Sequence, residues 1–274
     1  MPGHALHPAA PTMTALPILW RDEHLVAIYK PPGWLVHRTG LDAGETRFVV
    51  QTLRDQLGCH VYPVHRLDKG TCGVLALALH PQAARRLSEA FEQQRVAKRY
   101  LAAVRGWAPA RAEVDHALRP DDAPPDAPAQ AARTRFTCLA RLELPLESDP
   151  RFASTRASLV LAEPATGRRH QIRRHLKHLA HPILGDATHG KGPLNRWWAG
   201  QLGLQRLWLH AWSLQLPHPC SGAPLQVHSG LALAPAAAGA PPGPAGLEDW
   251  HALLHALPWQ WAGPESFPGA GAPP

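Results

Sequence analysis

The sequence predicts an α+β fold built on a mixed, largely antiparallel sheet. Short apolar runs with the length of strands are interleaved irregularly with segments whose apolar residues recur at helical spacing. The turns between these runs are short, as in antiparallel hairpins, and neither an internal repeat nor the regular alternation of a doubly wound fold is visible. At 274 residues the chain is long enough for one large domain, or two small ones, with a substantial core.

In the first half of the chain, strands alternate with two helices. The apolar run Leu25–Ile28 predicts a strand that ends at the KPPG breaker of Lys30–Gly33. Helical spacing of apolar residues predicts a helix over Glu45–Leu57, for which Gly58 is a suitable stop. We then expect a strand-turn-strand around Asp68, whose second strand spans Gly73–Leu79, followed by a helix over Pro81–Gln94 and a strand over Lys98–Arg105.

The second half begins with residues 120–132, PDDAPPDAPAQAA, which cannot build a core and predict a surface loop. We then expect strands over Arg133–Leu144 and Ser154–Leu161, a helix over Gly167–Ala180, and strands over Leu207–Leu216 and Leu225–Val227. Composition divides the chain into a loose segment over residues 1–16, a main domain over 17–230 and an Ala/Pro-rich tail over 231–274. Within the tail, only residues 247–257 have a helical pattern.

Composition favours a polyanionic partner and excludes several protein classes. The formal net charge is +7 and the pI is about 9.7, which suits RNA or DNA better than an acidic protein. The four scattered cysteines form no C-x-x-C pair, so we expect reduced thiols rather than a disulfide framework or a zinc knuckle. No signal peptide and no membrane-spanning apolar run are visible, so we expect a cytoplasmic protein.

The segment Pro63–Leu79, PVHRLDKGTCGVLALAL, places Asp68 in a tight turn between Arg66 and Lys69. Neighbouring cations favour the ionised form of a carboxyl group, which makes Asp68 a candidate nucleophile or base. Asp-Lys-Gly is also a common hairpin turn. Taken alone, the segment favours a structural role for Asp68 and leaves the catalytic role open.

The segment Thr166–His181, TGRRHQIRRHLKHLAH, predicts a basic amphipathic helix. Its apolar stripe consists of Ile172, Leu176 and Leu179. Arg174 and Lys177 lie on the opposite side, which favours a solvated basic face. Arg173 lies on the flank of the stripe, where it is either solvated or buried at the core edge with a carboxylate partner. The helical pattern leaves both interpretations open.

No metal and no cofactor are predicted. A histidine cluster in the basic segment raises a metal site as an alternative, and its members are His175, His178 and His181. No carboxylate or cysteine is adjacent to them, and no H-E-x-x-H motif occurs. Gly185–Gly192, GDATHGKG, is close to a P-loop, but Gly192 stands where Ser or Thr would hold magnesium. Pro193 follows where a phosphate-binding helix should begin.

Three motifs occur in a fixed order along the chain. They are His65–Asp68 (HRLD) with Thr71 and Gly73, then Lys98–Tyr100 (KRY), then Gly167-Arg168 with His170–Arg173 (HQIR). Together they resemble the RluA family of pseudouridine synthases, whose members carry H-R-L-D-x-x-T-S-G, K-R/x-Y and G-R-x-H-Q-[IL]-R. Supporting marks are Lys30-Pro31 with Gly33, and Leu184–Asp186. The likeness covers about residues 17–230, the expected catalytic domain. Cys72 stands where the family usually has Ser, which leaves its reactive or hydrogen-bonding role open.

The resemblance implies a bifurcated sheet flanked by helices, with a cleft across it, and the isomerisation of uridine to pseudouridine in RNA. It implies that Asp68 acts at the ribose, that Tyr100 stacks near the base and serves C5 proton removal, and that Arg173 pairs with Asp68. Arg66 is expected to help fill the stack vacated by a flipped uridine. Further substrate-binding candidates are His65, Thr71, Arg168 and His170. The isomerisation is redox-neutral, so it requires no cofactor.

Within the family, the chain most resembles members that modify uridine 65 in the T-stem of tRNA. The segments that carry this finer resemblance are Trp34–Arg38, Thr52–Gly58 and Gly203–Leu207. Large-subunit rRNA or another tRNA uridine is the alternative substrate, and a non-catalytic RNA-binding module is an alternative of another class. We expect tRNA as the partner, no membrane association, no obligatory protein partner and a monomer.

Overall fold

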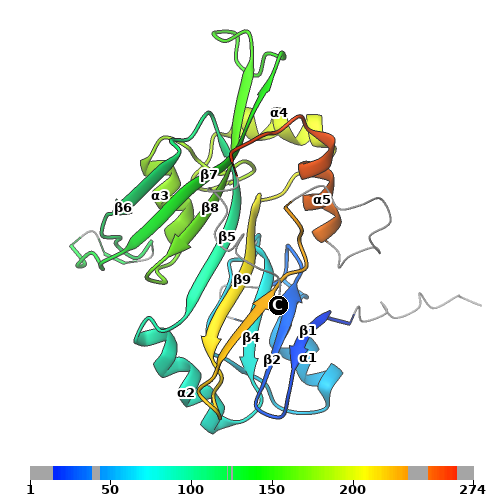
Figure 1. The fold of residues 1–274 in the computed structure, drawn as a ribbon, viewed down its shortest axis with the longest axis vertical. Helices are drawn as coiled ribbons and strands as arrows, with labels where there is room; N and C mark the ends of the chain where they lie inside the picture. The colour runs from blue at the N-terminus through cyan, green and yellow to red at the C-terminus, as the bar shows by residue number, and fades with distance from the viewer. Residues whose placement is uncertain (1–14, 39–43, 122, 125, 234–245, 264–274) are drawn as a thin grey trace, which may run out of the picture.

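The computed structural model describes residues 15–38, 44–121, 123–124, 126–233 and 246–263, and shows one mixed sheet flanked by helices (Figure 1). Predictions for residues 1–14 and for most of the tail lie outside these ranges. The strands are β1 (Ile18–Arg21), β2 (Leu25–Lys30), β3 (Tyr62–Pro63), β4 (Cys72–Ala78), β5 (Ala97–Arg105), β6 (Arg111–Asp115), β7 (Arg133–Leu144), β8 (Thr155–Pro164), β9 (Leu209–Pro217), β10 (Pro224–His228) and β11 (Gln260–Trp261). The helices are α1 (Val49–Leu57), α2 (Pro81–Glu92), α3 (Gln171–His178), α4 (Gly192–Leu202) and α5 (Leu247–Ala256).

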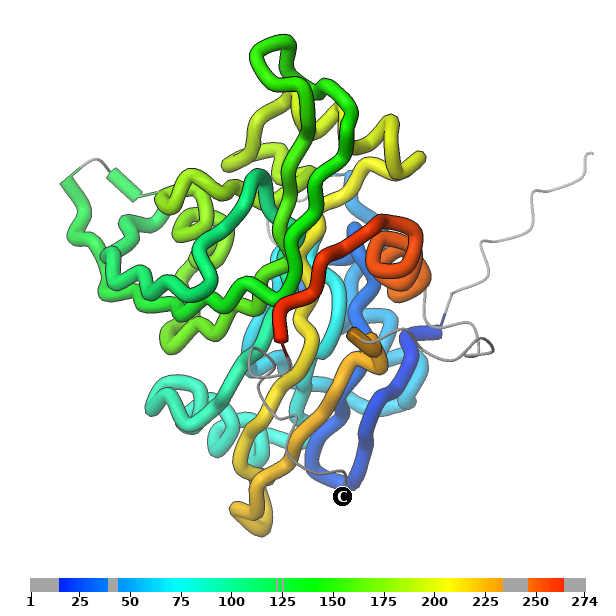
Figure 2. Tube along the Cα trace, turned by 45° about the horizontal axis from the view of Figure 1, so that its top comes forward, coloured from blue at the N-terminus to red at the C-terminus, as the bar shows by residue number. Residues whose placement is uncertain are grey.

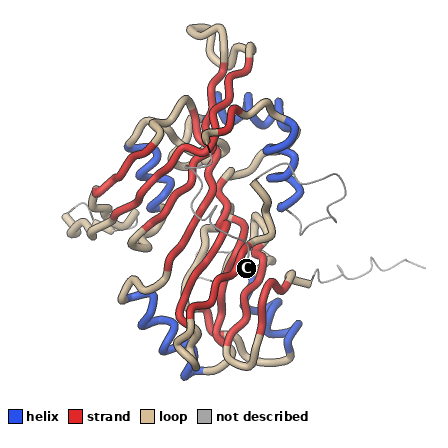
Figure 3. The backbone as a smooth tube through the Cα atoms, viewed as in Figure 1, coloured by secondary structure: helices blue, strands red, loops and turns tan. Residues whose placement is uncertain are grey.

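The sheet has the strand order β1-β2-β4-β9-β5-β8-β7-β11, with β3, β6 and β10 paired beside β4, β7 and β9. Figure 3 shows the strands in red. Among the described pairs of strands, only β4 and β9 are parallel. The first half of β9 pairs with β4 and the second half with β10, while β5 lies along its other edge. The sheet therefore forks at β9, which confirms the predicted bifurcated α+β fold.

A glycine allows the close approach of β4 and β9 directly after the Asp68 turn. Gly73 has a φ of +110°, and a Cβ there would lie 2.2 Å from the carbonyl oxygen of Ala211 on β9. Any side chain would force the two strands apart, because real Cβ contacts are never so short. All seven residues of β4 are buried, as expected for a strand covered on both faces.

Helices cover both parts of the sheet. In Figure 1, α1 and α2 lie with β1–β4, whereas α3 lies against β6–β8. The side chains of α4 and α5 join the largest core cluster, to which each contributes a fully buried tryptophan, Trp198 and Trp250. Figure 2 shows the red C-terminal segment running from α5 to the green strands, where β11 pairs with β7. No helix among the described residues is both long and apolar enough to cross a membrane.

Two predicted helices begin later than the sequence pattern indicates. Helix α1 begins at Val49 rather than Glu45, because Phe48 is extended and forms a bridge with Leu35. Helix α3 begins at Gln171 rather than Gly167, because His170 adopts a left-handed conformation with φ of 54°. This turn sets the direction in which the following helix presents its arginines.

Four elements were not predicted: β1, β6, α4 and β11. Helix α4 begins at Gly192 with Pro193 in its first turn, where proline is tolerated. Pro193 therefore does not prevent a helix here, contrary to the expectation from the sequence, although Gly192 still lacks the hydroxyl of a P-loop. Strands β1 and β11 are short edge strands, and pairing with a neighbour rather than a local apolar pattern makes them strands. The described residues of the segment 120–132 lie in a surface loop, as predicted, and Gln130 forms an isolated bridge with Leu118.

Candidate active site

A pocket of about 550 Å³ opens between the β3–β4 turn and the segment that precedes α3. It is lined by Val64–Asp68, Thr71, Phe91, Glu92, Gln94, Lys98, Tyr100, Pro164–Arg173 and Leu209. All eight site residues expected from the sequence are among them, although they come from three separate parts of the chain. The volume lies in the range of small-molecule sites, so the pocket can hold a nucleoside.

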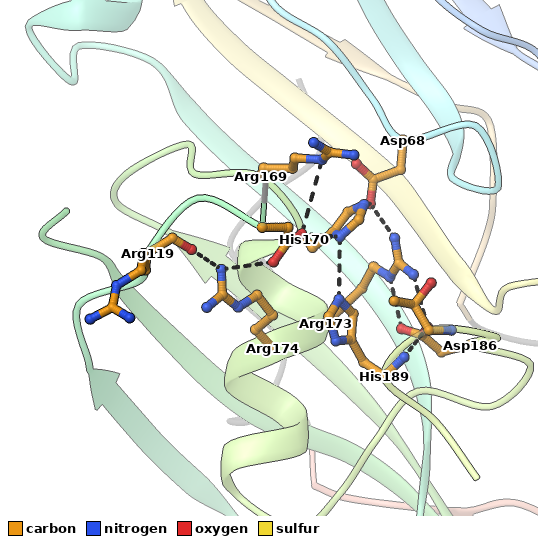
Figure 4. A network of polar contacts seen from close by, with 10 residues as sticks. Asp68, Arg119, Arg169, His170, Arg173, Arg174, Asp186 and His189 are labelled. Carbon is orange, nitrogen blue, oxygen red and sulfur yellow. Dashed lines mark hydrogen bonds and ion pairs between the residues drawn. The ribbon is translucent and has the colours of Figure 1, made fainter. Parts of the chain in front are cut away.

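A buried guanidinium holds the carboxylate of Asp68 (Figure 4). Arg173 donates from Nη1 to Asp68 Oδ2 at 3.0 Å, and from Nε and Nη2 to the two oxygens of Asp186 at 2.7 and 2.8 Å. Arg173 is only 7% exposed. Of the two positions that the sequence left open, solvated or buried with a carboxylate partner, the structure therefore shows the buried one. The bidentate pair with Asp186 fixes the plane of the guanidinium and so the direction of its third bond, to Asp68.

The partner Asp186 was not predicted as a site residue, although Leu184–Asp186 belongs to the motif pattern of the resemblance. Burial alone would raise the pKa of Asp186, but hydrogen bonds from Arg173 and the backbone N–H of His189 outweigh it and lower that pKa. Burial also opposes the charge of Arg173, yet the bonds to Asp186 raise its pKa. The Arg173–Asp186 pair is therefore ionised.

The backbone of the Asp68 turn is held from two sides. The N–H of Thr71 donates to the carbonyl of Asp68 at 3.1 Å, closing the turn. Behind it, the fully buried Lys30 donates from Nζ to the carbonyl of Lys69 at 3.2 Å and to that of Trp34 at 2.7 Å. Burial lowers the pKa of Lys30 to about 7. These contacts hold the backbone of the turn in place and so fix the position from which the Asp68 side chain extends.

The pocket walls hold neutral groups beside this ion pair. Burial and then the charge of Asp68 raise the pKa of Tyr100, so its phenol is neutral. Burial and then the charge of Lys98 lower the pKa of His65 to about 3. The neutral His65 ring accepts the N–H of Ala76 at 3.0 Å and stacks on Phe91 with centroids 4.7 Å apart. The structure thus places His65 as a wall of the pocket.

Cys72, whose role the sequence left open, forms buried hydrogen bonds. Its Sγ lies 2.9 Å from Nη2 of Arg206 and 3.2 Å from Nδ1 of His210. Burial would raise the pKa of Cys72, but these two groups lower it to about 6. Arg206 also donates to the carbonyl of Gly246 at 3.1 Å and to Asp249 of α5. The C-terminal helix is therefore tied to the strand that carries the Asp68 turn.

A second polar network surrounds Asp121, which lies in the loop over residues 120–132. His170 Nδ1 lies 2.8 Å and Arg174 Nη1 lies 3.2 Å from the carboxylate of Asp121. The predicted solvated position is therefore wrong for Arg174, which is half-buried, and confirmed for the exposed Lys177. Arg174 is half-buried because it contacts a loop that is distant in the sequence. The spacing of residues within a helix cannot predict such a contact.

The histidines of the basic segment are not gathered into a metal site. The buried His175 contacts the hydroxyl of Thr134 at 2.9 Å, and His181 faces the carbonyl of Arg105 at 2.8 Å. Within the described ranges, three other side chains have the spacing of a metal site: Asp121, His170 and His189. Two guanidinium groups flank this carboxylate and oppose a cation there, so we assign no metal to it.

Comparison with known proteins identifies the family. The model of the RNA pseudouridylate synthase family matches residues 24–178, which contain all of the pocket-lining motifs. The chain belongs to the RNA pseudouridylate synthase family. As a pseudouridylate synthase it is an isomerase, and the resemblance to the RluA family inferred from the motifs is confirmed.

Curated relatives of this pseudouridylate synthase match over most of its length. A tRNA pseudouridine synthase C of Vibrio cholerae is 43% identical over 252 residues, covering 89% of this chain and 97% of the relative. Proteins of the same name from Yersinia pestis and Salmonella typhimurium are 48% and 47% identical, over 76% and 79% of this chain and 83% and 85% of the relatives.

Solved structures of pseudouridylate synthase domains have the same fold. Human RNA pseudouridylate synthase domain containing 1 superposes with a TM-score of 0.62 at 25% identity, covering 84% of this chain and 88% of that one. Human RNA pseudouridylate synthase domain containing 4 gives 0.59 at 27% identity, covering 77% and 87%. The forked sheet is thus the fold of the family.

Proposed function

We propose that this pseudouridylate synthase isomerises uridine to pseudouridine in tRNA, at position 65 of the T-stem. The observation that carries the proposal is the Asp68 carboxylate, held 3.0 Å from the buried Arg173 beside Tyr100 in a pocket of nucleoside size. The relatives named tRNA pseudouridine synthase C, at 43–48% identity, support tRNA as the substrate. The net charge of +7 suits an RNA partner.

In the proposed reaction, the N1–C1′ bond of uridine breaks and the base turns within the pocket. A C5–C1′ bond then forms, C5 loses its proton and N1 gains one, so no oxidant or reductant is needed. Asp68 acts at the ribose, either by attacking C1′ or by removing the C2′ proton. Arg173 orients this carboxylate and balances its charge without moving during the reaction.

Tyr100 is proposed as the residue that stacks near the base. Because its raised pKa keeps the phenol neutral, it accepts the C5 proton only while passing its own proton to another base. The exposed Arg66 at the pocket rim would fill the stack that the flipped uridine leaves, which offsets an unstacking cost of about a few kcal/mol. We further propose that Thr71, Arg168 and His170 contact the nucleotide.

The proposal also covers the compartment and the oligomeric state of the protein. All four cysteines are free thiols, which suits a reducing compartment. We propose that it works in the cytoplasm as a monomer, without an obligatory protein partner.

The experiment that tests this function maps pseudouridine in total tRNA and rRNA from a strain lacking the gene. We expect loss of pseudouridine at tRNA position 65 alone, restored by the wild-type gene. Loss at an rRNA site or another tRNA uridine would replace the proposed substrate. Unchanged pseudouridine at every site would favour a non-catalytic RNA-binding module.

The lowered pKa of Lys98, which lines the pocket, predicts how the affinity for RNA depends on pH. Burial lowers the pKa of Lys98 to about 8, and a lysine carries its charge only below its pKa. We propose that the Lys98 ammonium, which lines the pocket, contacts a phosphate of the RNA. We therefore expect the affinity for tRNA to fall about three- to tenfold as the pH rises through this value, since this charged contact is lost. Equilibrium binding at constant ionic strength measures this. Lys98→Arg should remove the fall, and an equal fall in that variant would contradict the assignment.

A further inference from the structure

We propose that Arg169, His170 and Arg174 form a binding site for one phosphodiester of the RNA strand, and that the Asp121 carboxylate occupies this site until RNA displaces it. The inference deepens the proposed function and rests on it, since it takes RNA to be the ligand.

Two arginines and a histidine near the start of α3, Arg169, Arg174 and His170, converge on one carboxylate (Figure 4). His170 Nδ1 lies 2.8 Å and Arg169 Nε lies 4.0 Å from Oδ2 of Asp121, while Arg174 Nη1 lies 3.2 Å from Oδ1. A carboxylate and a phosphodiester each offer two oxygens to guanidinium and imidazole donors. The geometry that holds Asp121 is therefore also suited to a backbone phosphate.

The site adjoins the reacting carboxylate. The second nitrogen of the same imidazole, His170 Nε2, lies 3.9 Å from Oδ2 of Asp68. One imidazole ring thus separates the proposed phosphate position from the carboxylate that acts on the ribose. A nucleotide whose ribose reaches Asp68 carries its phosphates close to that ribose, so the spacing fits one nucleotide spanning both positions.

Asp121 has the features of an occupant that can leave. It lies in the Pro/Ala-rich loop over residues 120–132, which is mostly exposed and has little regular structure in its described part. Its own side chain is 29% exposed. Ion pairs of this exposure contribute only about 0–1 kcal/mol each, because water competes for both partners. A phosphate that also releases counterions from RNA can therefore replace it.

Arg174 and His170 are held by further contacts when Asp121 leaves. Arg174 Nη1 donates to the backbone carbonyl of Arg119 at 2.5 Å, a contact that does not depend on the carboxylate. His170 is fixed at the start of α3 by its left-handed backbone. Its Nδ1, the atom that faces Asp121, also lies 3.2 Å from Nε2 of His189. A site organised in advance loses less entropy on binding than one that must form around its ligand.

The test measures equilibrium binding of a tRNA transcript to the full chain over a potassium chloride series. We expect Asp121→Ala to tighten binding about three- to tenfold and to steepen the salt dependence by about one phosphate contact. Arg174→Ala should weaken binding and flatten the salt dependence by a similar amount. In the double variant, the gain from Asp121→Ala should shrink to less than half, because both changes act on one site.

Asp126→Ala is the matched control, because Asp126 is an exposed carboxylate of the same loop and does not line the pocket. If Asp126→Ala and Asp121→Ala tighten RNA binding equally, the effect comes from the change in net charge alone, and the inference is overturned. Weaker binding in Asp121→Ala with an unchanged salt slope would make Asp121 a structural contact and would also overturn it.

Tritium release from 5-tritiated uridine is measured in parallel and separates this inference from the proposed function. Release by the wild type without the expected shift in salt dependence refutes the phosphate site alone. The expected shift without any release refutes the proposed function and leaves a phosphate site for RNA.

Discussion

Asp68→Asn is expected to abolish pseudouridine formation while tRNA binding persists. An amide has nearly the shape of a carboxylate but cannot act as a nucleophile or base at the ribose, so we expect at least about a 1,000-fold loss of rate. Arg173 and the turn contacts that position residue 68 stay in place. Release of tritium from 5-tritiated uridine in tRNA measures the rate, and equilibrium binding measures the affinity.

Asp126→Asn makes the same chemical change outside the pocket and should retain the wild-type rate. Substantial tritium release by Asp68→Asn would refute the central role of this carboxylate. Loss of tRNA binding together with activity would point to a role in affinity instead of chemistry.

Arg173→Ala is expected to have the largest effect on stability. It leaves Asp186, whose side chain is fully buried, without its charged partner. An uncompensated buried charge costs about 3–5 kcal/mol of unfolding free energy. Activity should fall as well, because the same guanidinium orients Asp68 at 3.0 Å. Urea unfolding measures the free energy, and tritium release measures the activity of the fraction that remains folded.

A double variant separates the two roles of Arg173. Arg173→Met combined with Asp186→Asn removes both charges and keeps acceptors for the N–H groups of Thr188 and His189. We expect it to recover more than half of the lost stability but not the activity. Lys177→Ala, an exposed change on the same helix, should stay within about 0.5 kcal/mol of the wild type. Recovery of both stability and activity in the double variant would show that Arg173 is not needed for the reaction.

Elements with a strong local pattern could be predicted, whereas elements made by pairing could not. Helix α2 begins at Pro81 as predicted, with the preceding His80 accepting the N–H of Ala83, a signal contained within four residues. Strand β6 was missed because its pattern of one buried residue in five is weak and β7 alone stabilises it. The left-handed His170 was missed because that backbone conformation is rare outside glycine.

The short-range features of this protein follow from its sequence: the Asp68 turn, the apolar β4 strand, the basic helix and three ordered motifs. Such features depend on spacing within a few residues, and spacing is what a sequence records. Which charged side chains pair with one another depends instead on how distant segments fold together. It buried Arg173 between Asp68, 105 residues earlier, and Asp186, and it gave Arg174 a partner in the loop over residues 120–132. These contacts depend on the fork of the sheet at β9, which brings distant segments to one pocket and so sets burial and charge pairing there.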